Sequence, residues 1–203
     1  QALQTLERYK VRLDDVTSSL GALEVEDVVT RRDVAAVLQR SEMLRRISDE
    51  IDMMIVELGI DARLLRLQLD ELYGGTDDDL DLVMRDYAVD ADPSTITAVF
   101  NRLQELDDDA LLDVAATSAC LFPGGPDADL DQAVQPRGYR LLARIPRMTE
   151  ALAANVVERF GSLTKVLRST IDDLAEVPGL DPGRARVIKD ALGRLAESSI
   201  LEQ

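Results

Sequence analysis

The residues that could do chemistry are concentrated in a turn containing glycine and proline, Val177 to Arg186, and in the helix expected to follow it. Glycines let a backbone approach a ligand closely, and the free N–H groups at the start of a helix can hold a phosphate oxygen. Arg184, Arg186 and Lys189 lie on the first two turns of that helix, where cations can reach the same phosphate or its neighbours. The pattern predicts contact with a nucleic-acid backbone that does not depend on base sequence.

The turn belongs to a segment that occurs twice. Leu142 to Pro146 recurs as Leu174 to Pro178, and at the same offset Gly161 matches Gly193. In each copy an apolar helix precedes a turn containing proline, and a second helix with apolar residues at helical spacing is expected to end on the glycine. The repeat therefore predicts two helix–hairpin–helix units.

The two hairpins differ in the residues that could contact an anion. In the first copy, Arg147 replaces the first glycine of the turn, and Leu152 and Ala154 occupy the positions of Arg184 and Arg186. Arg144 and Arg147 can still supply positive charge there.

In the second copy, Asp181 is suited to cap the following helix and Pro182 to open it. The carboxylate of Asp181 would lie beside the predicted phosphate and weaken its binding. Paired units of this kind also serve as packing modules, so contact with nucleic acid and packing alone both stay open.

Residues 30–58 form the longest stretch whose apolar residues recur at helical spacing, and we expect this helix to position the elements around it. Thr30 and Asp33 resemble a capping box, and Gly59 is placed to end the helix. At ~1.5 Å per residue such a helix would be ~40 Å long, so we expect it to act as a spine. Its apolar stripe favours packing within the chain, with coiled-coil self-association as the alternative.

The remaining elements are also expected to be helical. We expect a break at Ser18 to Gly21 in the first segment, a helix capped by Asp61 whose leucines 64–72 pack on the spine, and a helix start at the acidic run 77–81. Further helices are expected from Pro93 and across residues 111–121.

The composition indicates an all-α fold and two domains. Only 3% of the residues are aromatic, and Gly and Pro gather at a few junctions rather than at strand spacing. The net charge is −16, but from Arg137 onward 11 Lys and Arg face 9 Asp and Glu, which leaves 12 against 30 before it. We therefore predict a helical spine domain over residues 1–122, a linker over 123–136 and a mildly basic tandem domain over 137–203.

Several classes of function are disfavoured. The absence of His excludes Ser-His-Asp and Cys-His catalysis and His-ligated zinc, and no phosphate-binding loop or dinucleotide fingerprint is present. We identify no catalytic residues and no metal ligands. The single cysteine, Cys120, is expected to be a buried structural thiol in a reducing cytoplasm, and no apolar run is long enough to span a membrane. The chain begins at Gln1, as expected for a fragment that lacks its N-terminal part.

Several segments together resemble the family of bacterial DNA integrity scanning (DisA) proteins, which are diadenylate cyclases. Residues 135–142, 145–147, 157–163 and 184–188 resemble the C-terminal region of that family, and residues 13–16, 34–40 and 64–69 resemble its helical middle domain. The resemblance covers essentially the whole chain. One departure is Asp181, which stands where the family usually has a second glycine.

The resemblance implies an all-α fold with a helical spine followed by a tandem helix–hairpin–helix domain that binds branched or damaged DNA. It implies an N-terminal cyclase domain that forms cyclic di-AMP from two ATP with Mg or Mn, an octameric full-length protein, and a cytoplasmic, nucleoid-associated location. The cyclase motifs are absent from these residues, so we expect no enzyme activity and no cofactor in this fragment. The DNA contacts transfer to the second hairpin, where Gly179, Leu180 and Gly183 would offer backbone N–H groups and Arg184, Arg186 and Lys189 would neutralise phosphates. The alternative is a structural oligomerisation and regulatory arm whose hairpins only pack.

Overall fold

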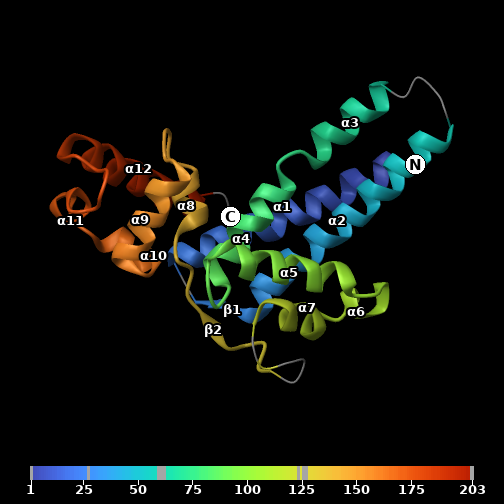
Figure 1. Ribbon diagram of the computed structural model, residues 1–203, viewed down its shortest axis with the longest axis horizontal. Coiled ribbons are helices and arrows are strands. Elements are labelled where there is room, and N and C mark those ends of the chain that lie inside the picture. The colour runs from blue at the N-terminus through green and yellow to red at the C-terminus, as the bar shows by residue number, and fades with distance from the viewer. Residues whose placement is uncertain (1, 27, 59–62, 123, 125–127, 202–203) are drawn as a thin grey trace.

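The computed structural model describes residues 2–26, 28–58, 63–122, 124 and 128–201, and these are almost entirely helical, as the composition predicts. The elements in chain order are α1 (Ala2–Glu26), β1 (Val29–Thr30), α2 (Arg31–Leu58), α3 (Arg63–Tyr73), α4 (Thr76–Tyr87), α5 (Pro93–Glu105), α6 (Asp108–Leu112), α7 (Val114–Leu121), β2 (Ala133–Val134), α8 (Tyr139–Ala143), α9 (Glu150–Phe160), α10 (Leu163–Arg168), α11 (Ile171–Ala175) and α12 (Pro182–Leu201). The molecule is elongated, with α8 to α12 at one end and the adjoining ends of α2 and α3 at the other (Figure 1). None of the helices in the described ranges has the length and apolar character that a bilayer crossing requires.

Helices α1 and α2 lie side by side and form the spine (Figure 1). The predicted break at Ser18 to Gly21 is wrong, because α1 is continuous from Ala2 to Glu26. Leu20 and Ala22 flank the glycine and are both buried. Burying such side chains outweighs the cost of about 1 kcal/mol that a glycine imposes within a helix.

The predicted start of α2 is confirmed. The Thr30 N–H donates to Asp33 Oδ2 at 2.8 Å, and the Asp33 N–H donates to Thr30 Oγ1 at 3.4 Å. The predicted stop at Gly59 and the predicted cap at Asp61 lie outside the described residues. Most of the apolar stripe of α2 is buried within the chain, in contact with α1, α4 and α7; the buried members are Val34, Val37, Leu38, Leu44, Ile51 and Ile55.

Helix α3 packs less completely than its leucines suggest. Leu69 is buried, but Leu64 and Leu67 are exposed, so the prediction that all the leucines of this segment pack on the spine is wrong. Only the second half of α3 approaches the hydrophobic cluster, where Leu72 and Tyr73 also contribute. The helix ends as predicted, with the Gly74 N–H donating to the Asp70 carbonyl and Gly75 in the left-handed region.

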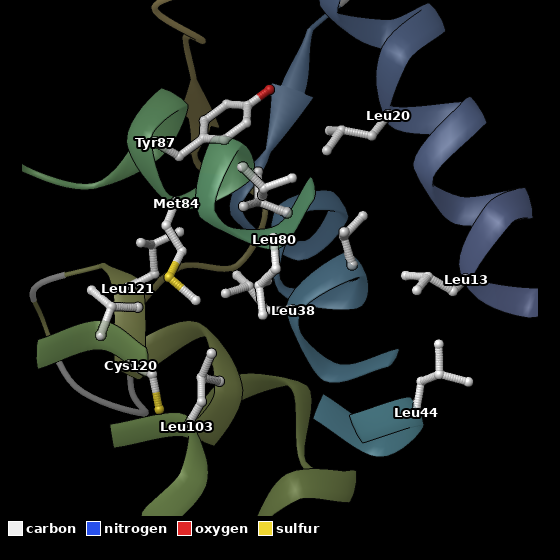
Figure 2. Packing of buried hydrophobic residues seen from close by; sticks show 14 of the residues in the cluster. Leu13, Leu20, Leu38, Leu44, Leu80, Met84, Tyr87, Leu103, Cys120 and Leu121 are labelled. Carbon is white, nitrogen blue, oxygen red and sulfur yellow. The ribbon is translucent and has the colours of Figure 1, made fainter. Parts of the chain in front are cut away.

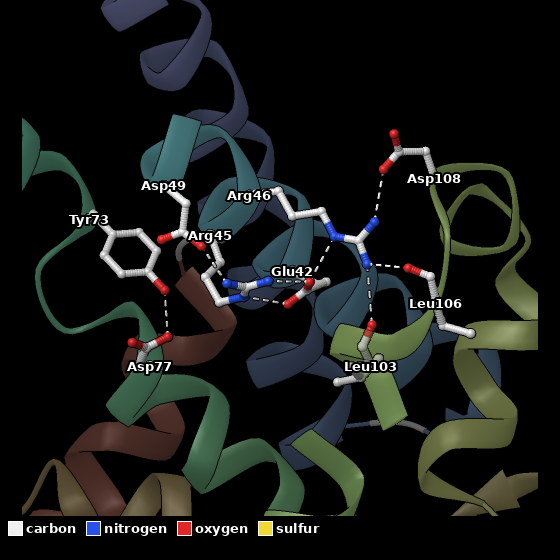
Figure 3. Close-up of polar contacts among 9 residues, drawn as sticks. All are labelled: Glu42, Arg45, Arg46, Asp49, Tyr73, Asp77, Leu103, Leu106 and Asp108. Atoms are coloured by element: carbon white, nitrogen blue, oxygen red, sulfur yellow. Dashed lines mark hydrogen bonds and ion pairs between the residues drawn. The ribbon is translucent and has the colours of Figure 1, made fainter. Parts of the chain in front are cut away.

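Helix α2 also carries a buried carboxylate that no pattern in the sequence indicated. The Glu42 side chain is 1% exposed and pairs with Arg45 at 2.7 Å and with Arg46 at 2.8 Å (Figure 3). Arg46 in addition donates to the carbonyls of Leu103 and Leu106 at the end of α5 (Figure 3). Glu42 therefore holds the cation that joins α2 to α5.

Two short helices replace the single one predicted across residues 111–121. The chain bends at Asp113, whose Oδ1 accepts from the Ala115 N–H and so caps the start of α7. Cys120 on α7 is buried among apolar side chains, as predicted (Figure 2). The two-residue strands β1 and β2 form an antiparallel pair that the sequence analysis did not anticipate.

The buried apolar residues form two clusters. The first gathers side chains from α1 to α7, including Leu38 of α2, Met84 of α4 and Leu103 of α5 (Figure 2). The second gathers side chains from Tyr139 to Leu192, with Leu82 of α4 and Ala91 packed against its edge. The C-terminal helices therefore have their own core, and they also contact α1 of the spine and the neighbouring helix α4.

Candidate nucleic-acid interface

The sequence repeat reappears in the backbone hydrogen bonds of the two hairpins. Ile145 N–H donates to the Leu142 carbonyl at 3.0 Å, and Val177 N–H donates to the Leu174 carbonyl at 3.1 Å. The next turn repeats as well, from Met148 to Ile145 at 3.1 Å and from Leu180 to Val177 at 3.0 Å. The two copies therefore share one backbone conformation although their side chains differ.

Each hairpin turns through a residue in the left-handed region. Gly179 has a φ of 89°, and Arg147, its counterpart in the first copy, has a φ of 63°. Such values suit glycine and cost a residue with a side chain about 1 kcal/mol. Arg147 is the only residue other than glycine with a positive φ in the described ranges.

Each second helix is capped by the residue that precedes it. Thr149 Oγ1 accepts from the Leu152 N–H at 3.3 Å, and Asp181 Oδ1 accepts from the Arg184 N–H at 2.9 Å. Helix α12 begins at Pro182, so the predicted capping role of Asp181 is confirmed. The cap uses one of the N–H groups at the helix start, and it places a carboxylate beside the remaining ones.

The backbone N–H groups of the second hairpin are not all available to a ligand. The Leu180 N–H donates to Val177, whereas in the described part of the chain the N–H groups of Gly179 and Gly183 have no acceptor. In the first hairpin, the N–H groups of Arg147 and Ala151 likewise have no acceptor among the described residues. The hairpins thus present equivalent pairs of donors at equivalent positions.

The three cations of the second hairpin do not converge on one point. The Arg184 side chain donates to the Arg147 carbonyl at 2.8 Å and so links the two hairpins. The Lys189 ammonium donates to the Leu167 carbonyl at 2.6 Å, next to the end of α10. Arg186 is exposed, and its side chain makes no hydrogen bond or ion pair within the described ranges. Of the three, Arg186 is the side chain most accessible to a phosphate.

The first hairpin adds two exposed cations. The side chains of Arg144 and Arg147 are both exposed. Acidic residues lie close to both turns. Glu150 on the first turn of α9 pairs with Arg85 of α4, and Glu176 before the second turn pairs with Arg159 at 2.6 Å. Both of these acids have cationic partners. At the second turn, Asp181 has no cationic partner among the described residues.

One feature of the predicted repeat is wrong. Gly161 ends α9 in the left-handed conformation with a φ of 75°, as predicted. Its counterpart Gly193 lies within α12, which continues to Leu201. Ala191 and Leu192 are buried, and Leu195 packs on the same cluster, so burial extends the helix past the glycine. The extended helix contacts α1 of the spine.

Two family models match the chain. The model described as the DisA bacterial checkpoint controller linker region matches residues 1–125, and the model of the SAM-like helix-hairpin-helix tandem matches residues 139–194. The first match covers more than half of the chain. The chain belongs to the DisA family.

Curated DisA relatives agree with this assignment. The chain is 51% identical to the DNA integrity scanning protein DisA of Acidothermus cellulolyticus, 51% to that of Streptomyces avermitilis and 51% to that of Kineococcus radiotolerans. Each alignment covers 100% of this chain but only 56%, 55% and 57% of the relative, respectively. The chain thus spans little more than half the length of these DisA proteins.

A buried carboxylate joins the two matched regions of this DisA chain. Asp86 at the end of α4 is 1% exposed and accepts the N–H groups that open α8: Gly138 at 2.7 Å, Tyr139 at 2.7 Å and Arg140 at 3.1 Å. The pKa of Asp86 is raised from 3.8 to about 7: burial is the largest cause, the neighbouring Glu24 adds to it, and the three N–H groups act in the opposite direction. Helix α8 is therefore capped by a residue of α4 that is more than 50 residues away in the sequence, rather than by a residue next to it.

Two arginines complete this junction. Arg137 donates to the carbonyls of Arg85 at 2.9 Å and Val89 at 2.8 Å. Arg140 pairs with Glu24 of α1 at 2.8 Å, and both side chains are nearly buried. Sequence reasoning missed the junction because nothing local distinguishes Asp86 or Glu24 from the many solvated acids of the chain. The contacts fix how the hairpins are presented relative to the spine.

Proposed function

We propose that this chain is the DNA-binding and spacer region of a DNA integrity scanning protein, and that its hairpins bind the phosphate backbone without reading base sequence. The observation that carries the proposal is the pair of unengaged N–H groups of Gly179 and Gly183, next to the exposed guanidinium of Arg186. Backbone N–H groups at a helix start bind phosphate oxygens, and such contacts do not report the base.

The first hairpin supports the same role through its equivalent N–H groups and the exposed cations Arg144 and Arg147. Two equivalent turns on one small domain suit two nearby phosphates. Because few cations are exposed and Asp181 opposes them, we expect modest affinity that falls steeply with salt. We further propose that branched or damaged DNA is the preferred form.

For the full-length protein, the resemblance to the family supports the presence of a further domain that converts two ATP into cyclic di-AMP with Mg or Mn. The relatives are longer than this chain, which leaves room for it. We propose that the spine joins that domain to the hairpins within an octamer in the cytoplasm, associated with the nucleoid. No catalytic role is assigned to any residue of this chain.

A structural role for the hairpins is the second candidate. It is favoured by the side chains of Arg184 and Lys189, which both donate to carbonyls inside the domain rather than extending into solvent. In that case the hairpins would serve packing, and the spine would orient the rest of the protein.

Titration of a fluorescent branched DNA against three variants distinguishes the two candidates. Arg186→Glu and Arg147→Glu each reverse a charge at a hairpin, and Arg12→Glu reverses an exposed charge on α1 as the matched control. DNA binding by the hairpins predicts weaker affinity for the first two variants and little change for the third. Equal affinity for all three variants, or no binding by the unmodified chain, would count against DNA binding.

A further inference from the structure

The turn of each hairpin lies close to the second helix of the other unit, and each of these two contact regions is called a seam here. In one seam the second hairpin lies on α9. Asn155 Nδ2 donates to the Pro178 carbonyl at 3.0 Å, and a Cβ added to Gly179 would lie 3.6 Å from Leu152 Cδ1. This seam is closed by a hydrogen bond and by side-chain packing.

In the other seam the first hairpin lies near the start of α12, and the closing residues are different. Val187 occupies the position equivalent to Asn155 and has no donor for the Pro146 carbonyl, which accepts no hydrogen bond from the described residues. Arg184 occupies the position of Leu152 and extends across to the Arg147 carbonyl. As a result a groove of about 370 Å³ remains open between the hairpins.

The lining of this groove combines apolar residues with two arginines. Ile145, Leu152 and Ile188 are buried side chains that contribute to it. Arg147 and Arg184 also line it, and Val187 is 59% exposed. Among the described residues that line the groove, none carries a carboxylate or an aromatic ring.

The apolar residues and the two arginines together indicate which kind of ligand fits the groove. A phosphate alone would leave the apolar lining unfilled, and an aliphatic side chain would leave both guanidinium groups without an anionic partner. A nucleotide with an unstacked base offers a flat apolar body, donors for the Pro146 carbonyl and a phosphate for the arginines. Arginine planes and apolar side chains both accept a base face.

We propose that the groove between the hairpins holds one unstacked nucleotide of the bound DNA. The inference rests on the proposed DNA-binding function and adds a site to it. Taking a base out of a paired duplex costs energy, and the cost is smallest where the base is already unpaired. The groove therefore provides a physical reason for binding branched or damaged DNA in preference to an intact duplex.

The test compares three labelled duplexes at one fixed salt concentration. The first carries a single unpaired adenine, the second an abasic site in place of that nucleotide, and the third is fully paired. Because the base removes an apolar face from water against the lining of the groove, the unmodified chain should bind the unpaired adenine severalfold more tightly than the abasic site.

The variant Val187→Met extends a longer side chain into the groove from an exposed position, without adding a ring on which a base could stack, and it leaves the buried core unchanged. It should abolish the preference for the adenine and keep the affinity for the paired duplex. Val11→Met is the matched control, since Val11 is 58% exposed on α1, and it should keep the preference.

The outcomes separate the two claims. Equal binding of the adenine and abasic duplexes, or a preference that survives Val187→Met, overturns the groove site and leaves backbone binding intact. Failure to bind any of the three duplexes overturns DNA binding itself and the groove site with it.

Discussion

The carboxylate of Asp86 lies 2.7 Å from the backbone nitrogen of Gly138, and this contact joins the end of α4 to the start of the hairpin domain. Two further N–H groups of α8 donate to the same side chain. A helix start normally finds its cap within a few residues along the chain. Here the cap comes from α4, far away in the sequence, so the orientation of the hairpins is tied to the packing of α4.

The titration of Asp86 should be visible in the stability of the protein. Its pKa is 3.8 when unperturbed and about 7 in the folded chain, where burial is the largest cause. Between pH 3.8 and pH 7, Asp86 therefore keeps its proton in the folded chain but has lost it in the unfolded chain. The contribution of Asp86 to the free energy of unfolding is accordingly largest at acidic pH and is lost as the pH rises towards 7.

Asp86→Asn removes this titration, and urea unfolding from pH 4 to pH 8 should show a flatter pH dependence than that of the unmodified chain. We also expect a loss of about 1–3 kcal/mol at pH 5, because the amide group cannot accept on both of its terminal atoms. An unchanged slope would contradict the assignment of a raised pKa to Asp86.

Substitution of Glu42 tests the polar cluster on the spine. Glu42→Gln should lower the free energy of unfolding by about 3 kcal/mol, because the nearly buried carboxylate is the shared partner of Arg45 and Arg46. Asp49→Asn removes the other, 60% exposed partner of Arg45 and should cost less than about 1 kcal/mol. Chemical denaturation measures both, and similar losses for the two variants would rule out the special role of Glu42.

The left-handed residue of the first hairpin allows folding and charge to be separated. Arg147→Gly should leave stability unchanged or raise it by up to about 1 kcal/mol, because glycine accepts a φ of 63° without strain. Gly179→Ala, at the equivalent turn, should lower stability by about 1 kcal/mol. Thermal unfolding checks both changes.

The same Arg147→Gly variant should bind DNA more weakly, since it removes an exposed cation next to the groove. Weaker binding together with unchanged or higher stability would show that the lost Arg147 side chain, and not a folding defect, causes the change. If Arg147→Gly binds DNA as well as the unmodified chain, the first hairpin does not contribute to binding.

The cap of α12 should oppose DNA binding through its charge alone. Asp181→Asn keeps a side-chain acceptor for the Arg184 N–H, so stability should change by less than about 0.5 kcal/mol. Removing a negative charge ~6 Å from a phosphate corresponds to about 0.7 kcal/mol in water, so affinity should rise about threefold at low salt. Asp181→Gly, which removes the carboxylate altogether, should also bind more tightly.

Anisotropy titrations at low and high salt measure this effect, and the gain should shrink as salt is added. Unchanged or weaker binding of both Asp181 variants at fixed salt would place the phosphate elsewhere than beside α12.

The sequence by itself determined the fold class, the hairpin repeat and most helix starts. These features depend on local chemistry: Thr30 with Asp33 and Asp181 with Pro182 specify helix starts within a few residues, and they appear in the structure as predicted. The repeat was visible because both copies need the same apolar positions and the same turn.

The tertiary structure decided what local signals could not specify. Because neighbouring side chains are buried, α1 continues through Gly21 and α12 continues through Gly193. Tertiary packing also leaves Leu64 and Leu67 exposed, and it buries the side chains of Asp86 and Glu42 with their partners. It also decided that Arg184 joins the hairpins and that Val187 leaves a groove between them. The physical reason is that a cap or a turn is set by neighbours in the chain, whereas the environment of a charge or a leucine is set by residues far apart in sequence.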